Sequence, residues 1–147
     1  MADDVTVTVR FGAEEPLIAF PAEGITVSVP LTPVGDRLYR LDGVPVFIES
    51  AAFGDVIEAE SLADGRLRFV QLTEPGGWRT FDFVLPPYQI DSEWGQSLLR
   101  ELEARGGHWE RVFGGMLFVC IPPGLELDPT PWVELAEPGA AADRPRD

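Results

Sequence analysis

Short runs in which apolar and polar residues alternate fill the first half of the chain, and they constrain its fold more than any other feature. Successive side chains of a β-strand point to opposite faces, so such runs predict half-buried strands. The dipeptides Asp42-Gly43 and Asp64-Gly65 lie between runs and are typical of hairpin turns. Strands at intervals of roughly ten residues predict a small antiparallel barrel or a curled sheet. The predicted strands are Val5–Val9, Ile25–Val29, Leu38–Leu41, Val44–Ile48, Val56–Glu60, Arg66–Leu72 and Trp78–Leu85.

The pattern changes after Pro86-Pro87, where apolar residues recur at helical spacing. Ser92 or Asp91 can accept a hydrogen bond from the first turn of a helix, and Gly106-Gly107 can end it. One face of this helix is apolar, because its large side chains stand at intervals of one and two turns. These side chains are Trp94, Leu98, Leu99 and Leu102.

Beyond the helix, His108–Phe113 and Met116–Ile121 are predicted to form a hairpin around Gly114-Gly115. A short last helix, capped by Asp128 or Thr130, would be packed down by Trp132, Val133 and Leu135. We therefore expect an α+β fold. An N-terminal antiparallel SH3-like barrel or curled sheet over residues 1–85 would precede a ferredoxin-like split βαβ half with two helices. That half, residues 86–137, would share its core with the first, and residues 138–147 would form a disordered tail.

The charge of the chain is strongly negative. It has 25 acidic residues against 11 basic ones, which gives a formal net charge of −14. Such a field repels nucleic-acid backbones and anionic membrane surfaces, whereas it favours fast encounter with basic partners. The alternative is that the charge only keeps the protein soluble. All the basic residues are arginine, which the base composition of a GC-rich genome is sufficient to explain.

The residue types needed for common catalytic mechanisms are scarce. The single histidine, His108, has no partner that the sequence identifies, and a general base needs one. The single cysteine, Cys120, lies in an apolar run and is expected to be a buried, inert thiol. The absence of lysine excludes a Walker A loop and Schiff-base chemistry. We predict no catalytic residues, no cofactor and no metal site.

The acidic segment from Asp55 to Asp64 is the candidate partner-binding surface. Glu58 and Glu60 fall on one face of their predicted strand, and a solvated sheet face is the alternative interpretation of this pattern. Arg66, Arg68 and Arg79 could instead gather beside Trp78 and bind single-stranded nucleic acid, but the overall charge opposes this.

The first residues lack the basic and apolar regions of a signal peptide. The longest apolar runs, of about six residues, are too short to span a membrane. The expected location is the cytoplasm.

Three blocks of sequence resemble a bacterial family known as domain of unknown function 4265. The blocks are Tyr39–Pro45, Phe53–Glu60 and Gly77–Phe81, and a looser match continues through the helix to Gly124. The likeness covers residues 25–135. At Gly43-Val44 the family often has Asn-Ile or a similar pair. The resemblance implies no activity and no site residues. The positions of glycine, proline and aspartate in these blocks suggest turn chemistry, with Gly54-Asp55 turning the chain into a strand.

Three hypotheses follow from these observations. The first is a non-enzymatic acidic module that binds a basic protein, in the concrete form of an immunity or antitoxin-type protein that neutralises a basic toxin. Asp55, Glu58, Glu60 and Asp64 would be its interface. The second is a small enzyme that uses carboxylates with His108 or Arg79. The third is a ligand sensor with a cavity lined by tryptophans, for which core packing is the alternative. These tryptophans are Trp78, Trp94, Trp109 and Trp132.

Overall fold

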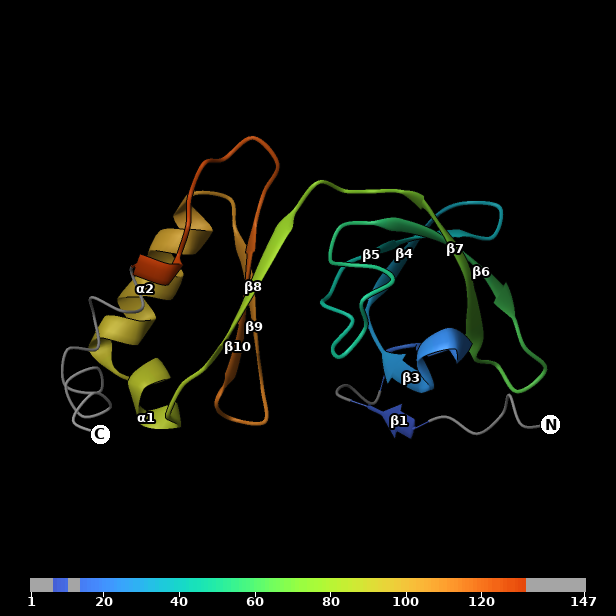
Figure 1. The fold of residues 1–147 in the computed structure, drawn as a ribbon, viewed down its shortest axis with the longest axis horizontal. Coiled ribbons are helices and arrows are strands. Elements are labelled where there is room, and N and C mark those ends of the chain that lie inside the picture. The colour runs from blue at the N-terminus through green and yellow to red at the C-terminus, as the bar shows by residue number, and fades with distance from the viewer. Residues whose placement is uncertain (1–6, 11–13, 132–147) are drawn as a thin grey trace. The chain divides into compact units, whose positions relative to one another are not determined.

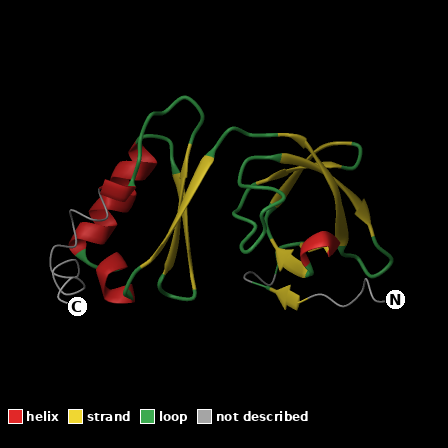
Figure 2. Ribbon diagram, in the orientation of Figure 1, coloured by secondary structure: helices red, strands yellow, loops and turns green. Residues whose placement is uncertain are grey.

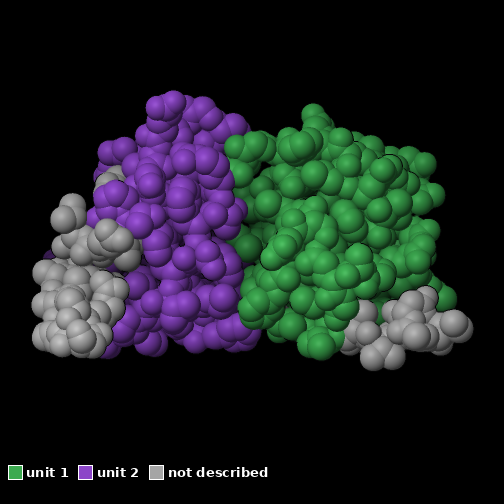
Figure 3. Space-filling view, in the orientation of Figure 1, with its two compact units in different colours: residues 1–78 green, residues 79–147 purple. Residues whose placement is uncertain are grey.

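The structure is a computed structural model that describes residues 7–10 and 14–131 (Figure 1). It divides into two compact units, Met1–Trp78 and Arg79–Asp147 (Figure 3). Strands dominate the first unit, and the second combines strands with helices (Figure 2). The expected α+β class is confirmed. Among the described residues, no helix is long and apolar enough to cross a membrane.

A seven-stranded sheet with the order β1-β3-β2-β7-β6-β5-β4 forms the first unit. β1 pairs with β3, and β2 with β7, in parallel, and the other neighbours are antiparallel. The expectation of a wholly antiparallel sheet was therefore wrong at these two pairings. The strands are β1 (Val7–Val9), β2 (Leu17–Phe20), β3 (Ile25–Ser28), β4 (Leu31–Gly35), β5 (Leu38–Leu41), β6 (Val56–Ser61) and β7 (Leu67–Glu74).

The segment Val44–Ile48, expected to be a strand, is a loop. Strand β5 pairs directly with β6, and the loop between them is closed by two backbone hydrogen bonds at its base. Leu41 N–H donates to the Asp55 carbonyl over 2.8 Å, and Gly54 N–H donates to the Leu41 carbonyl over 2.9 Å. Residues 44–46 are buried, and this burial explains the apolar character of the segment.

The second unit holds a three-stranded antiparallel sheet with the order β8-β10-β9. Ser92 caps α2 as expected, since its Oγ accepts a hydrogen bond from Gly95 N–H over 3.1 Å. Gly106, with φ of 85°, follows the end of α2. The elements are β8 (Arg79–Val84), α1 (Pro87–Ile90), α2 (Glu93–Ala104), β9 (His108–Val112) and β10 (Met116–Ile121).

The division between the units differs from the expected one after residue 85. Strand β8 pairs with β10 from Arg79 onward, so it belongs to the second unit. Of the expected last helix, only its beginning at Thr130 and Pro131 is described. Trp132, Val133, Leu135 and the expected tail over 138–147 lie outside the described residues.

Each unit has its own cluster of buried apolar side chains. In the first unit the cluster is formed by residues of the seven-stranded sheet and its loops and includes Phe20, Leu41 and Ile57. In the second unit, α2 packs its apolar face on the small sheet through Leu99 and Leu102, which meet Val119 and neighbouring residues of β10. The helical spacing read from the sequence therefore identifies the packed face correctly.

Candidate functional site

Strand β6 presents Glu58 and Glu60 on its outward face. Burial alternates along this strand. Ile57 and Ala59 are buried, whereas Glu58 and Glu60 are partly exposed. The prediction that these two carboxylates share one face is therefore confirmed.

The turn between β4 and β5 and the neighbouring strand β7 bring cations to both glutamates. The Arg37 guanidinium lies 3.1 Å from Glu58 Oε2 and 3.9 Å from Glu60 Oε1. Arg68, on β7, is paired with Glu60. Gln71 Nε2 donates a hydrogen bond to Glu58 Oε1 over 2.9 Å. The run of sequence around these glutamates holds no basic residue, yet the folded surface around them is close to neutral.

Asp64 occupies the turn between β6 and β7. Its carboxylate accepts hydrogen bonds from the Arg66 backbone N–H over 3.0 Å and from Arg66 Nε over 2.7 Å. These contacts, the backbone bond first, hold the pKa of Asp64 below its usual value. Gly65, with φ of 92°, completes the turn, so the expected hairpin at Asp64-Gly65 is present.

Asp55 lies below the surface, with only 7% of its area exposed. Its Oδ2 accepts from Ala52 N–H over 2.9 Å, and its Oδ1 accepts from Gly76 N–H over 2.7 Å. The carboxylate thus joins the end of one loop to the segment that follows β7. The structure places Glu58 and Glu60 together and gives Asp55 and Asp64 separate roles in turns.

The only histidine and the only cysteine of the chain are cross-strand neighbours in the small sheet. Cys120 on β10 is opposite His108 on β9 and opposite Thr80 on β8. His108 Nε2 lies 2.7 Å from Glu110 Oε2. Burial, with a smaller contribution from the nearby charge of Glu110, raises the pKa of Cys120 to about 12, although the hydrogen bond from Thr80 acts in the opposite direction. The thiol is therefore protonated at neutral pH, as expected for an inert cysteine.

Arg79 and Trp109 have local partners. Arg79 donates hydrogen bonds to the carbonyls of Leu125 and Leu127, over 2.9 and 2.8 Å. Trp109 Nε1 donates to Glu103 Oε2 over 2.8 Å. Arg79 belongs to a different unit from Arg66 and Arg68, whose side chains pair with Asp64 and Glu60.

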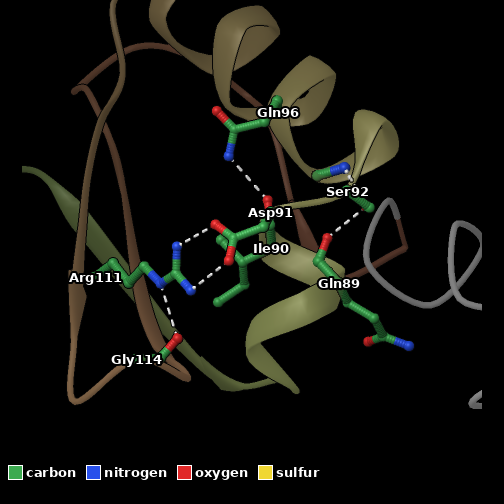
Figure 4. A network of polar contacts seen from close by, with 8 residues as sticks. Gln89, Ile90, Asp91, Ser92, Gln96, Arg111 and Gly114 are labelled. Atoms are coloured by element: carbon green, nitrogen blue, oxygen red, sulfur yellow. Dashed lines mark hydrogen bonds and ion pairs between the residues drawn. The ribbon is translucent and has the colours of Figure 1, made fainter.

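A polar network that the sequence did not predict fixes the corner between α1 and α2 (Figure 4). Arg111 Nη1 and Nη2 lie 2.6 and 3.1 Å from the two carboxylate oxygens of Asp91, and Arg111 Nε donates to the Gly114 carbonyl over 2.8 Å. The hydrogen bond with Arg111 holds the pKa of Asp91 below its usual value. Gln96 Nε2 donates to the Ile90 carbonyl over 2.9 Å. The network ties the β9–β10 hairpin to the helices.

No metal centre is apparent in the described part of the chain, where no group of three or more His, Cys, Asp or Glu side chains is placed to hold an ion.

Comparison with known proteins identifies the family. The sequence matches DUF4265, described as a domain of unknown function, over residues 26–130. The chain belongs to the DUF4265 family. The resemblance seen in the sequence is thus confirmed.

Other comparisons add fold information alone. A crystal structure of a hypothetical protein from Neisseria gonorrhoeae is similar to this DUF4265 chain, with a TM-score of 0.55 and 17% sequence identity. The likeness covers 89% of this chain and 92% of the other. No curated protein matches the chain.

Two of the sequence blocks that carry the DUF4265 resemblance meet in space around Gly54. The ring of Trp78 packs edge-on against Phe53, with centroids 4.8 Å apart. A side-chain carbon on Gly54 would lie 2.6 Å from Trp78 Cδ1, and the φ of Gly54 is 88°. The contact therefore needs glycine for space and for backbone conformation. Together with the hydrogen bonds of Asp55, this packing supports the turn chemistry inferred for these blocks.

Proposed function

We propose that this DUF4265 protein is a non-enzymatic module that binds a basic protein, in the manner of an immunity or antitoxin protein that neutralises a basic toxin. One observation carries the proposal: among the described acidic residues, only Asp55 is buried. The other acidic residues of the described part of the chain are therefore at least partly exposed, in a sequence that has 25 acidic and 11 basic residues. A surface of this kind attracts cationic proteins and raises their rate of association.

The proposed interface is the outward face of β6 with Glu58 and Glu60, continued by Asp64 at the turn. Asp55 is buried, so in this proposal it stabilises the backbone at the start of β6 and does not contact the partner. The arginines that pair with the glutamates do not block it. Exposed ion pairs contribute little net free energy, so guanidinium or ammonium groups of a partner can replace Arg37 and Arg68.

Capture from a lysate of the bacterial host, at low and moderate salt, tests the proposal. The retained protein is purified and titrated against the wild type and against Glu58→Arg/Glu60→Arg. The double variant Glu101→Arg/Glu126→Arg is the matched control, because it changes the net charge equally at exposed positions of the second unit. We expect one stoichiometric basic partner whose affinity falls at least about tenfold in the first variant alone.

Equal losses in both variants would show a non-specific charge effect and refute the interface. Absence of a basic partner under either salt condition would refute the function.

A small enzyme is the second candidate, and the pairing of His108 with Glu110 favours it. A carboxylate that orients an imidazole is a common feature of general-base sites. Turnover of a metabolite panel that is lost in His108→Ala and in Glu110→Gln would support an enzyme. The ligand-sensor alternative predicts a saturable change of tryptophan fluorescence with a small molecule.

The finer description of the fold and the location belong to the same proposal. We assign the first unit to the SH3-like barrels and the second to the ferredoxin-like halves, on the basis of the seven-stranded sheet and of the strand–helix–helix–strand–strand order. A bacterial cytoplasm fits a chain whose only cysteine is a free thiol. Neither nucleic acid, nor a membrane, nor a cofactor is part of the proposed activity.

A further inference from the structure

Strand β8 is an edge strand of the small sheet. In the order β8-β10-β9 it pairs with β10 on one side, and no described strand lies on its other side. The pairing with β10 is regular along the whole of β8, from Arg79 opposite Ile121 to Val84 opposite Met116. A regular edge strand can accept a further strand, because its outward backbone groups are already arranged as in a ladder.

One hydrogen bond shows which backbone groups of β8 face outward. Leu85 N–H donates to the Gly115 carbonyl over 2.8 Å, directly across the ladder that β8 forms with β10. In an antiparallel pair, residues whose N–H and C=O groups face the partner strand alternate with residues whose groups face away. Counted back from Leu85, every second residue therefore faces β10, and the residues between them face the free edge. These outward residues are Thr80, Asp82 and Val84.

The outward backbone groups have no hydrogen-bond partner among the described residues. All three residues are exposed, and Val84 is the most exposed of them at 83%. Their spacing of two residues is the spacing at which an added antiparallel strand would exchange hydrogen bonds with them. The free edge of β8 is therefore open to an extended segment of another chain.

The other sheet edges in the described part of the chain are less suitable. Strand β1 is only three residues long. Strand β4 contains Pro33 and a register shift between Pro33 and Gly35, and both features hinder edge pairing. Strand β9, by the same alternation, turns outward only Trp109 and Arg111. Among these edges, β8 offers the longest regular run of outward groups.

Strand β8 is held in place before any partner binds. Arg79 donates hydrogen bonds to the carbonyls of Leu125 and Leu127, which fix the start of the strand. Phe81 and Phe83, on the opposite face of the strand from Asp82, pack against the apolar core of the second unit. An edge that is ordered before binding loses little conformational entropy when a partner docks.

We propose that the free edge of β8 binds an extended segment of a basic partner protein as an additional antiparallel strand. The inference rests on the proposed function, which supplies the basic partner, and adds a second contact to it. Charge selects the occupant. Asp82 is exposed, and its carboxylate has no hydrogen-bond or ion-pair partner among the described residues. Its cross-strand neighbour on β10 is the uncharged Phe118. The residue opposite Asp82 in the added strand is therefore arginine or lysine.

A second copy of this chain is a poor occupant of the same edge. Two copies of β8 can pair about a two-fold axis, and the register in which all the outward residues overlap is centred on Asp82. This register would place the two Asp82 carboxylates directly opposite each other, and like charges in that position destabilise a strand pair. Each copy also carries a net charge of −14.

Amide hydrogen exchange of the free chain tests whether the edge is open. The N–H groups of Phe81 and Phe83 face β10, whereas those of Asp82 and Val84 face outward. We expect the outward amides to exchange at least about tenfold faster than the inward ones. Protection of Asp82 and Val84 that does not depend on protein concentration would show that another part of this chain covers the edge, and it would overturn the proposal.

A fluorescently labelled peptide, Arg-Val-Ile-Arg-Ile-Thr-Arg, is the probe for strand addition. Its central arginine is designed to lie opposite Asp82 in the antiparallel register. Two N-methylated forms with the same side chains and charge are matched controls. The first is methylated at the central arginine and the threonine, whose N–H groups would point to β8. The second is methylated at the two isoleucines, whose N–H groups would point away.

Fluorescence anisotropy with the full chain compares the three peptides. We expect the unmodified peptide and the second methylated form to bind alike, and the first methylated form to bind at least about tenfold more weakly. Bound peptide should also slow the exchange of the outward amides of β8.

Two substitutions at Val84 test the same edge from the side of the protein. Val84→Pro removes one outward N–H group, and proline is tolerated on an edge strand where that group faces solvent. Val84→Thr keeps the N–H group and is the matched control. The affinity for the unmodified peptide should fall about tenfold in Val84→Pro and should be unchanged in Val84→Thr. Amide chemical shifts of β10 verify that the sheet remains folded.

Charge reversal tests the pairing with Asp82. Asp82→Lys should weaken binding of the unmodified peptide about tenfold, and a peptide with glutamate in place of the central arginine should restore it. Glu126→Lys is the matched control, because it makes the same change of charge at an exposed position of the second unit. This control should keep the preference for the peptide with arginine.

The other outcomes overturn the proposal in distinguishable ways. Equal binding of the two methylated peptides would refute strand addition and leave the proposed function intact. A captured basic protein that binds Val84→Pro as tightly as the wild type would have the same meaning. Concentration-dependent self-association that Val84→Pro abolishes would identify a second copy as the occupant. Absence of binding by the peptides, together with absence of a captured basic protein, would refute both.

Discussion

Replacing Asp55 with alanine tests whether this residue of the acidic segment is a structural one. The substitution leaves the backbone N–H groups of Ala52 and Gly76 without the carboxylate oxygens that accept from them at 2.9 and 2.7 Å. The Gly76 backbone packs closely against Gly54, since a side-chain carbon at Gly76 would lie 2.3 Å from the Gly54 carbonyl oxygen. The first unit should therefore lose stability while β6 keeps its outward glutamates.

The expected loss follows from the two hydrogen bonds. A hydrogen bond to a charged acceptor contributes about 1.5–3 kcal/mol. Both bonds here are partly buried, which places them near the lower end of that range. The free energy of unfolding should fall by about 3 kcal/mol in Asp55→Ala. Asp55→Asn keeps one acceptor oxygen and should lose about half as much.

Urea denaturation followed by far-ultraviolet circular dichroism measures these losses, and amide hydrogen exchange at Ala52 and Gly76 locates them. Asp64→Ala is the control, because it removes the same carboxylate from an exposed turn and should change the unfolding midpoint little. A loss below about 1 kcal/mol in Asp55→Ala, or equal midpoints for the two alanine variants, would refute the structural role.

Three further substitutions or treatments have defined outcomes. Gly54→Ala and Gly65→Ala share a positive φ, but only the first meets a tryptophan ring, so urea denaturation should show Gly54→Ala to be less stable by about 1–3 kcal/mol. Cys120, with its pKa raised to about 12 and no exposed surface, should react with a thiol reagent at pH 8 only after unfolding. Asp91 has a lowered pKa, so its contribution to stability is complete above the unfolded value of about 3.9 and is lost as pH falls further. Asp91→Asn should flatten that part of a plot of urea midpoint against pH, and an unchanged slope would contradict the ion pair.

Elements that depend on interactions between residues close in the sequence were predicted correctly. The alternation around Val56, the turn at Asp64-Gly65 and the cap at Ser92 each follow from side-chain periodicity or from one local hydrogen bond, and all are present. Longer-range features were missed. Strand β2 is a short apolar run without alternation, because three of its four residues are fully buried. Strand β4 contains Pro33, and the sheet tolerates it because β4 is an edge strand.

The segment Val44–Ile48, which was expected to be a strand and is a loop, shows a second reason why a local sequence pattern can mislead. Its apolar residues fit a strand by composition, and Asp42-Gly43 fits a hairpin turn. In the structure the Asp42 carboxylate instead accepts hydrogen bonds from Thr32 and from Arg40 Nε, the latter over 2.8 Å. Burial alone would raise the pKa of Asp42, but these bonds lower it. The competing hydrogen bonds, ten and two residues away, cannot be seen in a dipeptide signal.

The candidate site depends most on strand register. Asp55, Glu58 and Glu60 lie close together in one acidic run, yet the first is buried and the other two face arginine or glutamine. In a regular ladder continuing from the pairs Glu60–Arg68 and Ala59–Phe69, Glu58 would lie opposite Val70. A register shift between Glu58 and Ala59 brings Gln71 there instead, and its amide donates to the carboxylate. Because a single extra residue in β7 decides whether Glu58 has a hydrogen-bond donor or an apolar neighbour, sequence can identify the acidic strand but not how much of its charge a partner can reach.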